Sequence, residues 1–228
     1  TWLQGFLLQL FNIIIMLPLI IVLYIPLFTF IFAQAKSGNS NPEMFSDFFV
    51  GMSFLYILFV IVGVFVLGAV SVALNAAFFR IMRTLDEGET IKTSDFFCFI
   101  NGKYLSKTFM LMLVTVLIAI PSVLLFYIPL IYMMVPFSLF ALIFAFNPEL
   151  NVGDIVKISF KLGHKKWLLI FGLIFVCSLL AQVVGFILCG IGTLFTAAFV
   201  YHPTYLIYKE VIGFDNDDEI STNGETNE

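Results

Sequence analysis

The stretch that decides the fold is Asn147 to Trp167, NPELNVGDIVKISFKLGHKKW, a charged segment between two long runs without Asp, Glu, Lys or Arg. The run before it, Thr108 to Pro148, has 41 residues, and the run after it, Trp167 to Tyr208, has 42. Because about 20 apolar residues cross the hydrocarbon of a bilayer, each run is long enough for two crossings. The flanks therefore predict membrane hairpins, and the charged segment predicts a surface connection between them.

The composition is that of a membrane protein. Of the 228 residues, 61% are hydrophobic and only 11% are charged, whereas soluble domains average about 25% charged residues. The net charge of −4 comes from the end of the chain, because six of the 15 acidic residues lie in the last fourteen. We expect one membrane domain over residues 1–213 and a flexible acidic tail over 214–228. The basic residues are too dispersed for a nucleic-acid-binding face.

The runs together predict an all-α polytopic membrane protein with about six transmembrane helices in three hairpins, about 2–83, 104–147 and 166–210. The first hairpin is interrupted by the polar loop Lys36 to Asp47, KSGNSNPEMFSD. Tight turns are expected at Tyr127-Ile128-Pro129 and Cys189-Gly190-Ile191-Gly192, where Pro and Gly interrupt the apolar runs. The sequence begins on Thr1-Trp2 without a basic region before the first apolar run, so no signal peptide is predicted.

Two amphipathic helices, about 94–102 and 152–164, are expected to lie in the membrane interface on the cytoplasmic side. In the second helix a polar stripe contains three lysines, and a fourth lysine follows it before an expected interfacial tryptophan. These residues either contact lipid headgroups or a partner, or only anchor the helix: Lys157, Lys161, Lys165, Lys166 and Trp167. Ten of the eleven basic residues fall on this side and Lys36 on the other. The positive-inside rule therefore predicts that both termini are cytoplasmic.

Small residues recur every four positions in two of the expected helices, a spacing that places them on one face where another helix packs closely. The two stripes are candidates for packing against each other. The first consists of Ala69, Ala73 and Ala77, and the second of Cys177, Ala181, Gly185 and Cys189. We interpret the two cysteines there as small packing residues.

The two amphipathic connections follow one pattern, an interfacial helix before a two-crossing unit, which indicates an internal repeat. In each, a glutamate is followed by an aspartate that opens the helix and by lysines before the next run: Glu89, Asp95, Lys103 and Lys107; Glu149, Asp154 and Lys161 to Lys166. The alignment also matches Thr1-Trp2-Leu3 with Lys166-Trp167-Leu168. This match predicts a further interfacial helix upstream of Thr1.

Several short motifs carry a resemblance to a known family: Asn147-Pro148-Glu149-Leu150, Ser159-Phe160-Lys161-Leu162, Gly163-His164-Lys165-Lys166-Trp167, a Gly-Ile-Gly turn and Pro203. Over roughly Ala76 to Gly213 the chain resembles an uncharacterised family of bacterial six-helix membrane proteins. That family is related to the membrane domain fused to some glycerophosphodiester phosphodiesterases. The resemblance implies a six-helix fold in a bacterial inner membrane. It implies no chemistry, because the matched part excludes the phosphodiesterase domain. The sequence departs from the family at Ile128-Pro129-Leu130, where relatives usually have Pro-Gly.

No catalytic motif, metal-ligand spacing or cofactor motif appears in the sequence, and we expect neither enzyme activity nor a cofactor. His202 is the candidate intramembrane polar site, either as a ligand-binding group or as a hydrogen-bonding partner of a neighbouring helix. Two functions remain open. The first is an accessory or scaffold subunit of a larger bacterial envelope complex, with a protein partner as well as membrane lipid. The second is a carrier of lipid or another small amphiphile, which a bundle without a cavity would exclude.

Overall fold

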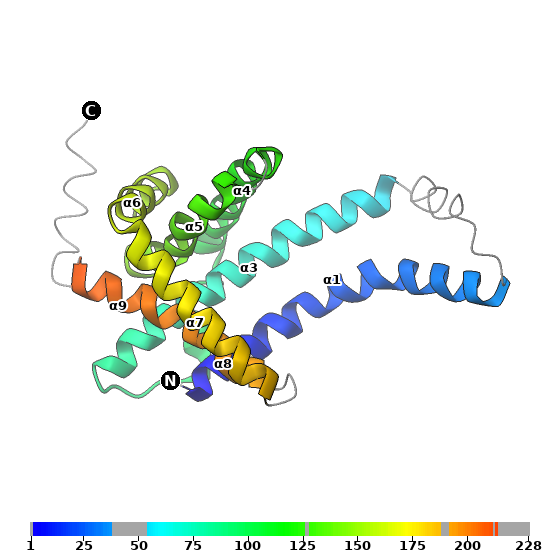
Figure 1. The fold of residues 1–228 in the computed structure, drawn as a ribbon. Coiled ribbons are helices and arrows are strands. Elements are labelled where there is room, and N and C mark those ends of the chain that lie inside the picture. The colour runs from blue at the N-terminus through cyan, green and yellow to red at the C-terminus, as the bar shows by residue number, and fades with distance from the viewer. Residues whose placement is uncertain (1, 38–53, 126–127, 188–191, 212, 214–228) are drawn as a thin grey trace.

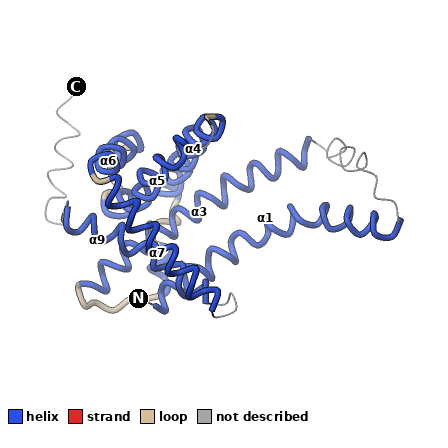
Figure 2. The backbone as a smooth tube through the Cα atoms, in the orientation of Figure 1, coloured by secondary structure: helices blue, strands red, loops and turns tan. Residues whose placement is uncertain are grey.

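The computed structural model describes residues 2–37, 54–125, 128–187, 192–211 and 213 (Figure 1). Within these ranges every regular element is helical (Figure 2). In the described part of the chain, five helices are long and apolar enough to cross a membrane: α1 (Trp2–Ser37), α3 (Phe54–Asp86), α4 (Gly102–Leu124), α5 (Ile128–Phe146) and α7 (Trp167–Ile187). The architecture is compatible with the all-α, multi-pass membrane class that the sequence predicts.

The last apolar segment forms three consecutive short pieces in place of one regular helix. They are α8 (Gly192–Thr196), the 3₁₀ turn η2 (Ala197–Val200) and α9 (Tyr201–Val211). Pro203 has no N–H for the carbonyl of Phe199, so the α-helical ladder cannot be complete at this point. The backbone N–H of Tyr201 bonds instead to the carbonyl of Ala198 with 3₁₀ spacing. Membrane crossing by this segment therefore requires all three pieces.

The core is built around the second half of α3, which packs against α1, α4 and α5. The alanine stripe of this helix is fully buried, with Ala73 and Ala77 showing no exposed surface. Another small residue faces α4, where the end of the Met112 side chain occupies the space beside Gly68: a β-carbon there would lie 2.8 Å from Met112 Cε. Small residues thus allow the close helix packing that association in lipid requires.

The second part of α1 and the first part of α3 extend together, as an arm, away from the other helices (Figures 1 and 2). We use "the arm" for residues 13–37 of α1 and 54–66 of α3. The two helices are joined there by the hydroxyl of Tyr56, which donates to the carbonyl oxygen of Val22 at 3.0 Å. Large apolar side chains along the arm are exposed, with Phe32 at 75% and Phe54 at 76%. The first turns of α1 pack elsewhere, against α8 and η2.

The first amphipathic connection differs from the expected helix over 94–102. It is one 3₁₀ turn, η1 (Thr93–Phe97), and α4 already begins at Gly102. The side chains of Phe96 and Phe99 are both buried, and their spacing of three residues matches the 3₁₀ period. Asp95 fixes the turn by accepting a hydrogen bond from the backbone N–H of Lys92 at 2.8 Å. A longer helix was predicted because the apolar residues also share an arc of an α-helical wheel.

The second amphipathic connection is the helix α6 (Val152–Lys165), which begins and ends close to the expected positions. Its buried face, formed by Ile155, Ser159, Leu162 and Gly163, is covered within the protein, where α6 packs along α5. The two helices are antiparallel neighbours, because Gly163 near the end of α6 contacts Pro136 in the first half of α5. The apolar stripe that suggested membrane contact is therefore used at least in part for packing on α5.

Several expectations fall outside the described residues. These are the turn residues Tyr127 and Cys189 to Ile191 and the acidic tail over 214–228. Of the expected turns, Ile128 and Pro129 are the first residues of α5, and Gly192 begins α8. The α4 and α5 helices pack together over the segment expected as the middle hairpin, and α7 packs against α8, η2 and α9 over the last one.

Candidate functional site

A cavity of about 490 Å³ lies between α3, α4, α5, α7 and the η2–α9 segment. We call it "the cavity". Its volume lies within the range of about 300–1,000 Å³ that is typical of ligand sites. Most of its lining residues are aliphatic or aromatic: Val72, Asn75, Phe79, Leu111, Met112, Thr115, Met134, Val135, Phe137, Ser138, Phe140, Ala141, Phe171, Ile174, Phe175, Ser178, Val200, Tyr201 and Thr204.

The polar side chains of the cavity wall are largely bonded within the protein. The hydroxyl of Tyr201 donates to Asn75 Oδ1 at 3.2 Å, which links α9 to α3. The hydroxyls of Thr115 and Ser138 donate to backbone carbonyls of their own helices at 2.8 Å and 2.7 Å. Bonding of this kind presents a mostly apolar wall, which suits a hydrocarbon chain better than a polar substrate.

The lysines of α6 do not line the cavity. Lys157, Lys161 and Lys165 are exposed, whereas the opposite face of the helix is buried on α5. Lys166 is half-buried and lines a second, open groove on the surface between α7 and α9. Lys157, Lys161 and Lys165 are therefore accessible to lipid headgroups, water or a partner.

Trp167 belongs to an aromatic cluster that joins α5, α6 and α7. Its indole N–H donates to the carbonyl oxygen of Tyr132 at 3.0 Å, and its ring stacks on Phe171 with centroids 4.8 Å apart. The hydroxyl of Tyr132 lies 2.8 Å from Nδ1 of His164. Tyr132 was not predicted from the sequence, since a single tyrosine in an apolar run has no motif around it. This cluster fixes the beginning of α7 against α5.

His202 lies half-buried near the start of α9. Its Nδ1 is 3.3 Å from the carbonyl oxygen of Ala198, one turn earlier in the same segment, and its ring centroid is 5.6 Å from that of Phe199. It lines the same surface groove as Lys166 and not the cavity. The described contact of the imidazole is thus local, and not with another helix.

The second small-residue stripe packs beside α8 and not against the alanine stripe of α3. The buried hydroxyl of Thr196 donates at 3.0 Å to the carbonyl oxygen of Ala181 on α7. Gly185 is also buried, Cys177 is half-buried, and Cys189 lies outside the described residues. The backbone carbonyl at Ala181 is reachable because the side chain there is small.

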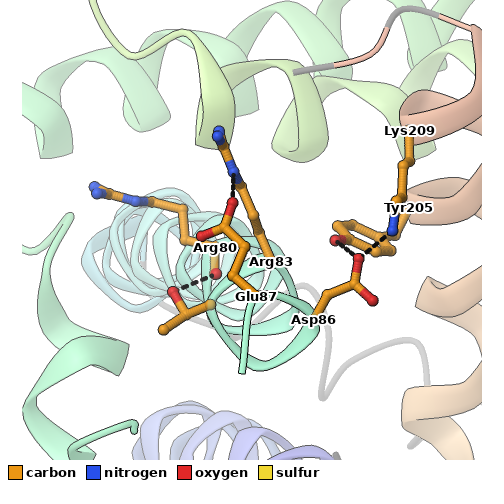
Figure 3. A network of polar contacts seen from close by, with 7 residues as sticks. Arg80, Arg83, Asp86, Glu87, Tyr205 and Lys209 are labelled. Carbon is orange, nitrogen blue, oxygen red and sulfur yellow. Dashed lines mark hydrogen bonds and ion pairs between the residues drawn. The ribbon is translucent and has the colours of Figure 1, made fainter. Parts of the chain in front are cut away.

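Charged and polar residues gather where α3, α5 and α9 end. Asp86 of α3 accepts hydrogen bonds from Tyr205 and Lys209 of α9, and Arg83 is paired with Glu87 at 2.8 Å (Figure 3). The two hydrogen bonds of Asp86 join the last turn of α3 to α9. They place a polar layer at the end of the apolar helices.

The same layer contains the connection between α5 and α6. Lys103 of α4 forms an ion pair with Glu149 at 2.7 Å, and the hydrogen bond from the ammonium group lowers the pKa of that carboxyl. Lys107 donates to the carbonyl oxygens of Pro148 and Leu150 at 2.6 Å and 3.2 Å. A basic side chain thus satisfies backbone carbonyls beyond the C-terminus of α5, as the helix dipole favours.

A polar pocket of about 440 Å³ lies in this layer, and we call it "the polar pocket". Its residues come from the end of α3, the loop after it and the end of α5: Arg80, Arg83, Thr84, Glu87, Glu89, Ala145, Phe146 and Pro148. From the sequence, these arginines served only to predict orientation. A local signal was present but unused: two arginines lie three residues apart, and Glu87 and Glu89 follow within six residues of Arg83.

Among the residues that the structure describes, no three or more His, Cys, Asp or Glu side chains are grouped so that they could hold a metal ion. The site and fold define a helical, membrane-type protein with an apolar cavity and a polar pocket at one end. No family model, curated protein sequence or solved structure matches this chain. The resemblance to the bacterial six-helix family therefore stays a hypothesis.

Proposed function

We propose that this chain is a non-enzymatic integral membrane protein that binds a lipid or another small amphiphile in the cavity and acts as its carrier. The cavity carries the proposal. A scaffold needs only a well-packed bundle, whereas this bundle is hollow where five helical segments meet. Its largely apolar wall matches a hydrocarbon chain.

The test is photo-crosslinking in liposomes with a phospholipid that carries a diazirine on its acyl chain. Ser178 lines the cavity from α7, so Ser178→Phe fills it. The matched control is Leu180→Phe on the same helix, because Leu180 is 57% exposed and points away from the interior. We expect labelled peptides from the cavity walls of α5 and α7, several-fold less labelling in Ser178→Phe and unchanged labelling in Leu180→Phe.

The opposite result has a clear form. If the diazirine labels the exposed residues of α1 and α7 evenly and Ser178→Phe changes nothing, the cavity holds no acyl chain. A second cavity-filling variant, Ala141→Phe on α5, tests the same point if Ser178→Phe does not fold. Both variants are compared with the wild type for their apparent melting temperature in detergent before labelling.

The second candidate is the accessory or scaffold subunit of a bacterial envelope complex, which the arm favours. Its two helices are covered chiefly by each other, and its outer side chains form a long apolar surface. Such a surface suits either lipid or the membrane helices of a partner. If purification in a mild detergent returns the chain alone every time, this candidate loses its basis.

We also propose the finer membrane arrangement: six crossings in three hairpins, with α8, η2 and α9 forming the sixth, and both termini in the cytoplasm of a bacterium. The polar layer supports this arrangement, since the ends of α3 and α5 line one polar pocket, and Asp86 at the end of α3 is bonded to Tyr205 and Lys209 of α9. A carrier built from two related halves would alternate around the cavity between them.

A further inference from the structure

We propose that the polar pocket binds the headgroup of a zwitterionic phospholipid that carries a primary ammonium group, while an acyl chain of the same lipid lies in the cavity. This inference rests on the proposed amphiphile binding and specifies its ligand. It depends on two observations, the relative positions of the two spaces and the charges of the polar pocket.

The two spaces follow one another along the same pair of helices. On α3, Phe79 lines the cavity and the next residue, Arg80, lines the polar pocket. On α5, Ala141 lines the cavity and Ala145, one turn later, lines the polar pocket. Both helices run toward the polar layer, so the polar pocket lies beyond the cavity at the same end of the bundle.

The separation fits one lipid molecule. From Asn75, within the cavity wall, to Arg83 in the polar pocket is eight residues, or about 12 Å along a helix. One leaflet of a bilayer has about 15 Å of hydrocarbon and a further 5–7 Å of headgroup region, so the middle of a chain lies about 10 Å from its headgroup. The candidate spans Tyr56–Asp86 and Pro129–Phe146 also end beside the polar pocket. Ends of membrane-spanning helices are expected near the headgroups.

The charges of the polar pocket balance: two arginines and two glutamates line it. Arg83 and Glu87 are paired with each other at 2.8 Å (Figure 3). Among the described residues, neither Arg80 nor Glu89 has an oppositely charged group within 4.0 Å. The guanidinium of Arg80 instead lies over the ring of Phe99, 5.5 Å from its centroid.

Arg80 and Glu89 carry opposite charges, and a zwitterionic headgroup likewise carries one positive and one negative group. A guanidinium binds phosphate through several N–H donors, and a carboxylate accepts hydrogen bonds from a primary ammonium group. A quaternary ammonium has no N–H to donate, and an anionic headgroup without an amine leaves the glutamate unpaired. The pocket therefore favours an ethanolamine-type headgroup over choline-type and glycerol-type headgroups.

The test uses native mass spectrometry of the full chain reconstituted with equal amounts of phosphatidylethanolamine, phosphatidylcholine and phosphatidylglycerol. We expect the ethanolamine lipid to be retained about tenfold more than the choline lipid, the factor that one charge-assisted hydrogen bond supplies. Arg80→Gln weakens retention of all three lipids. Glu89→Gln removes the preference for ethanolamine over choline, and Lys157→Gln, on the exposed face of α6, leaves all three unchanged.

Failure of the headgroup assignment can be distinguished from failure of the carrier proposal. If all three lipids are retained equally and Glu89→Gln has no effect, while the acyl-chain probe still labels the cavity, the headgroup assignment is wrong and the carrier proposal stands. If the acyl-chain probe does not label the cavity, the proposed function fails, and the headgroup assignment fails with it. Because Arg80 and Glu89 are both exposed, their substitution is not expected to prevent folding.

Discussion

Gly163 of α6 lies directly against Pro136 of α5: a β-carbon at position 163 would be 3.2 Å from Pro136 Cγ and 3.4 Å from its Cδ. Both residues are buried, and neither the proline ring nor the helix backbone yields easily. We therefore expect Gly163→Leu to separate α6 from α5 and to cost about 1–3 kcal/mol, the usual effect of overpacking. The measurement is the apparent melting temperature of the detergent-purified protein.

The same helix offers a matched control at Gly153, where an added β-carbon meets nothing within 4 Å. Gly153→Ala should be neutral or slightly stabilising, because alanine loses less backbone entropy in a helix. If Gly163→Leu were as stable as Gly153→Ala, the close contact between α6 and α5 would be wrong.

The contact between α1 and η2 can be tested at Gly5. A β-carbon there would lie 2.4 Å from Ala198 Cβ, so one of the two backbones has to move. We expect Gly5→Ala to lower the melting temperature in detergent by an amount equivalent to about 1–3 kcal/mol. Gly172→Ala on α7 serves as the control, since the space around Gly172 is open. Equal melting temperatures of the two variants would contradict the packing of α1 on η2.

The ion pair between Lys103 and Glu149 predicts a dependence of stability on pH. Since the hydrogen bond from Lys103 lowers the carboxyl pKa in the folded protein, the stabilisation is complete above the ordinary value of 4.5. It is lost as the pH falls through the lower, folded-state pKa. The melting temperature of Lys103→Gln should therefore be slightly below that of the wild type at pH 7, and the difference should shrink toward pH 3. Lys161→Gln should show no such difference, and a gap that widens on acidification would refute the assignment.

Cys98 should react slowly with alkylating reagents. Burial raises its pKa above the ordinary thiol value of 9.0, and the nearby Arg80 partly opposes that rise. In a chain with Cys177 and Cys189 replaced by serine, we expect the alkylation rate to increase with pH around a midpoint above 9.0. An exposed thiol in Ser94→Cys, compared in a chain that also lacks Cys98, should titrate near the ordinary value. Adding Arg80→Gln should raise the midpoint for Cys98 further, and a fall would show that Arg80 is not beside the thiol.

The proposed membrane orientation predicts from which side of the membrane three lysine positions can be labelled. With native cysteines removed, Lys92→Cys and Lys161→Cys should both react with an impermeant maleimide only from the cytoplasmic side. Lys36→Cys should react only from the opposite side, because Lys36, in the last turn of α1, is the single base expected there. Labelling of Lys92→Cys and Lys161→Cys from opposite sides would exclude the proposed hairpins.

The long helices could be predicted from the sequence because length, charge and apolar content alone determine them. Local backbone conformations were harder to predict. The 3₁₀ turn at Phe96 and the break before Pro203 depend on tertiary burial and on a missing N–H, and neither changes the pattern of apolar residues. The amphipathic stripe of α6 identified a helix but not what covers it, since a membrane and α5 both bury apolar side chains. The polar pocket was missed because charged residues are expected at the end of any apolar helix, and only the fold brings Arg80 and Glu89 beside Ala145 and Pro148.

The arm has a consequence for the bilayer itself. Its helices α1 and α3 contain 36 and 33 residues, which is about 50 Å of helix, whereas the hydrocarbon core is about 30 Å thick. The excess must be absorbed by steep inclination, by local thickening of the membrane or by emergence of one end. We expect this hydrophobic mismatch to make the angle between the arm and the body depend on lipid chain length, so that membrane thickness acts on the protein.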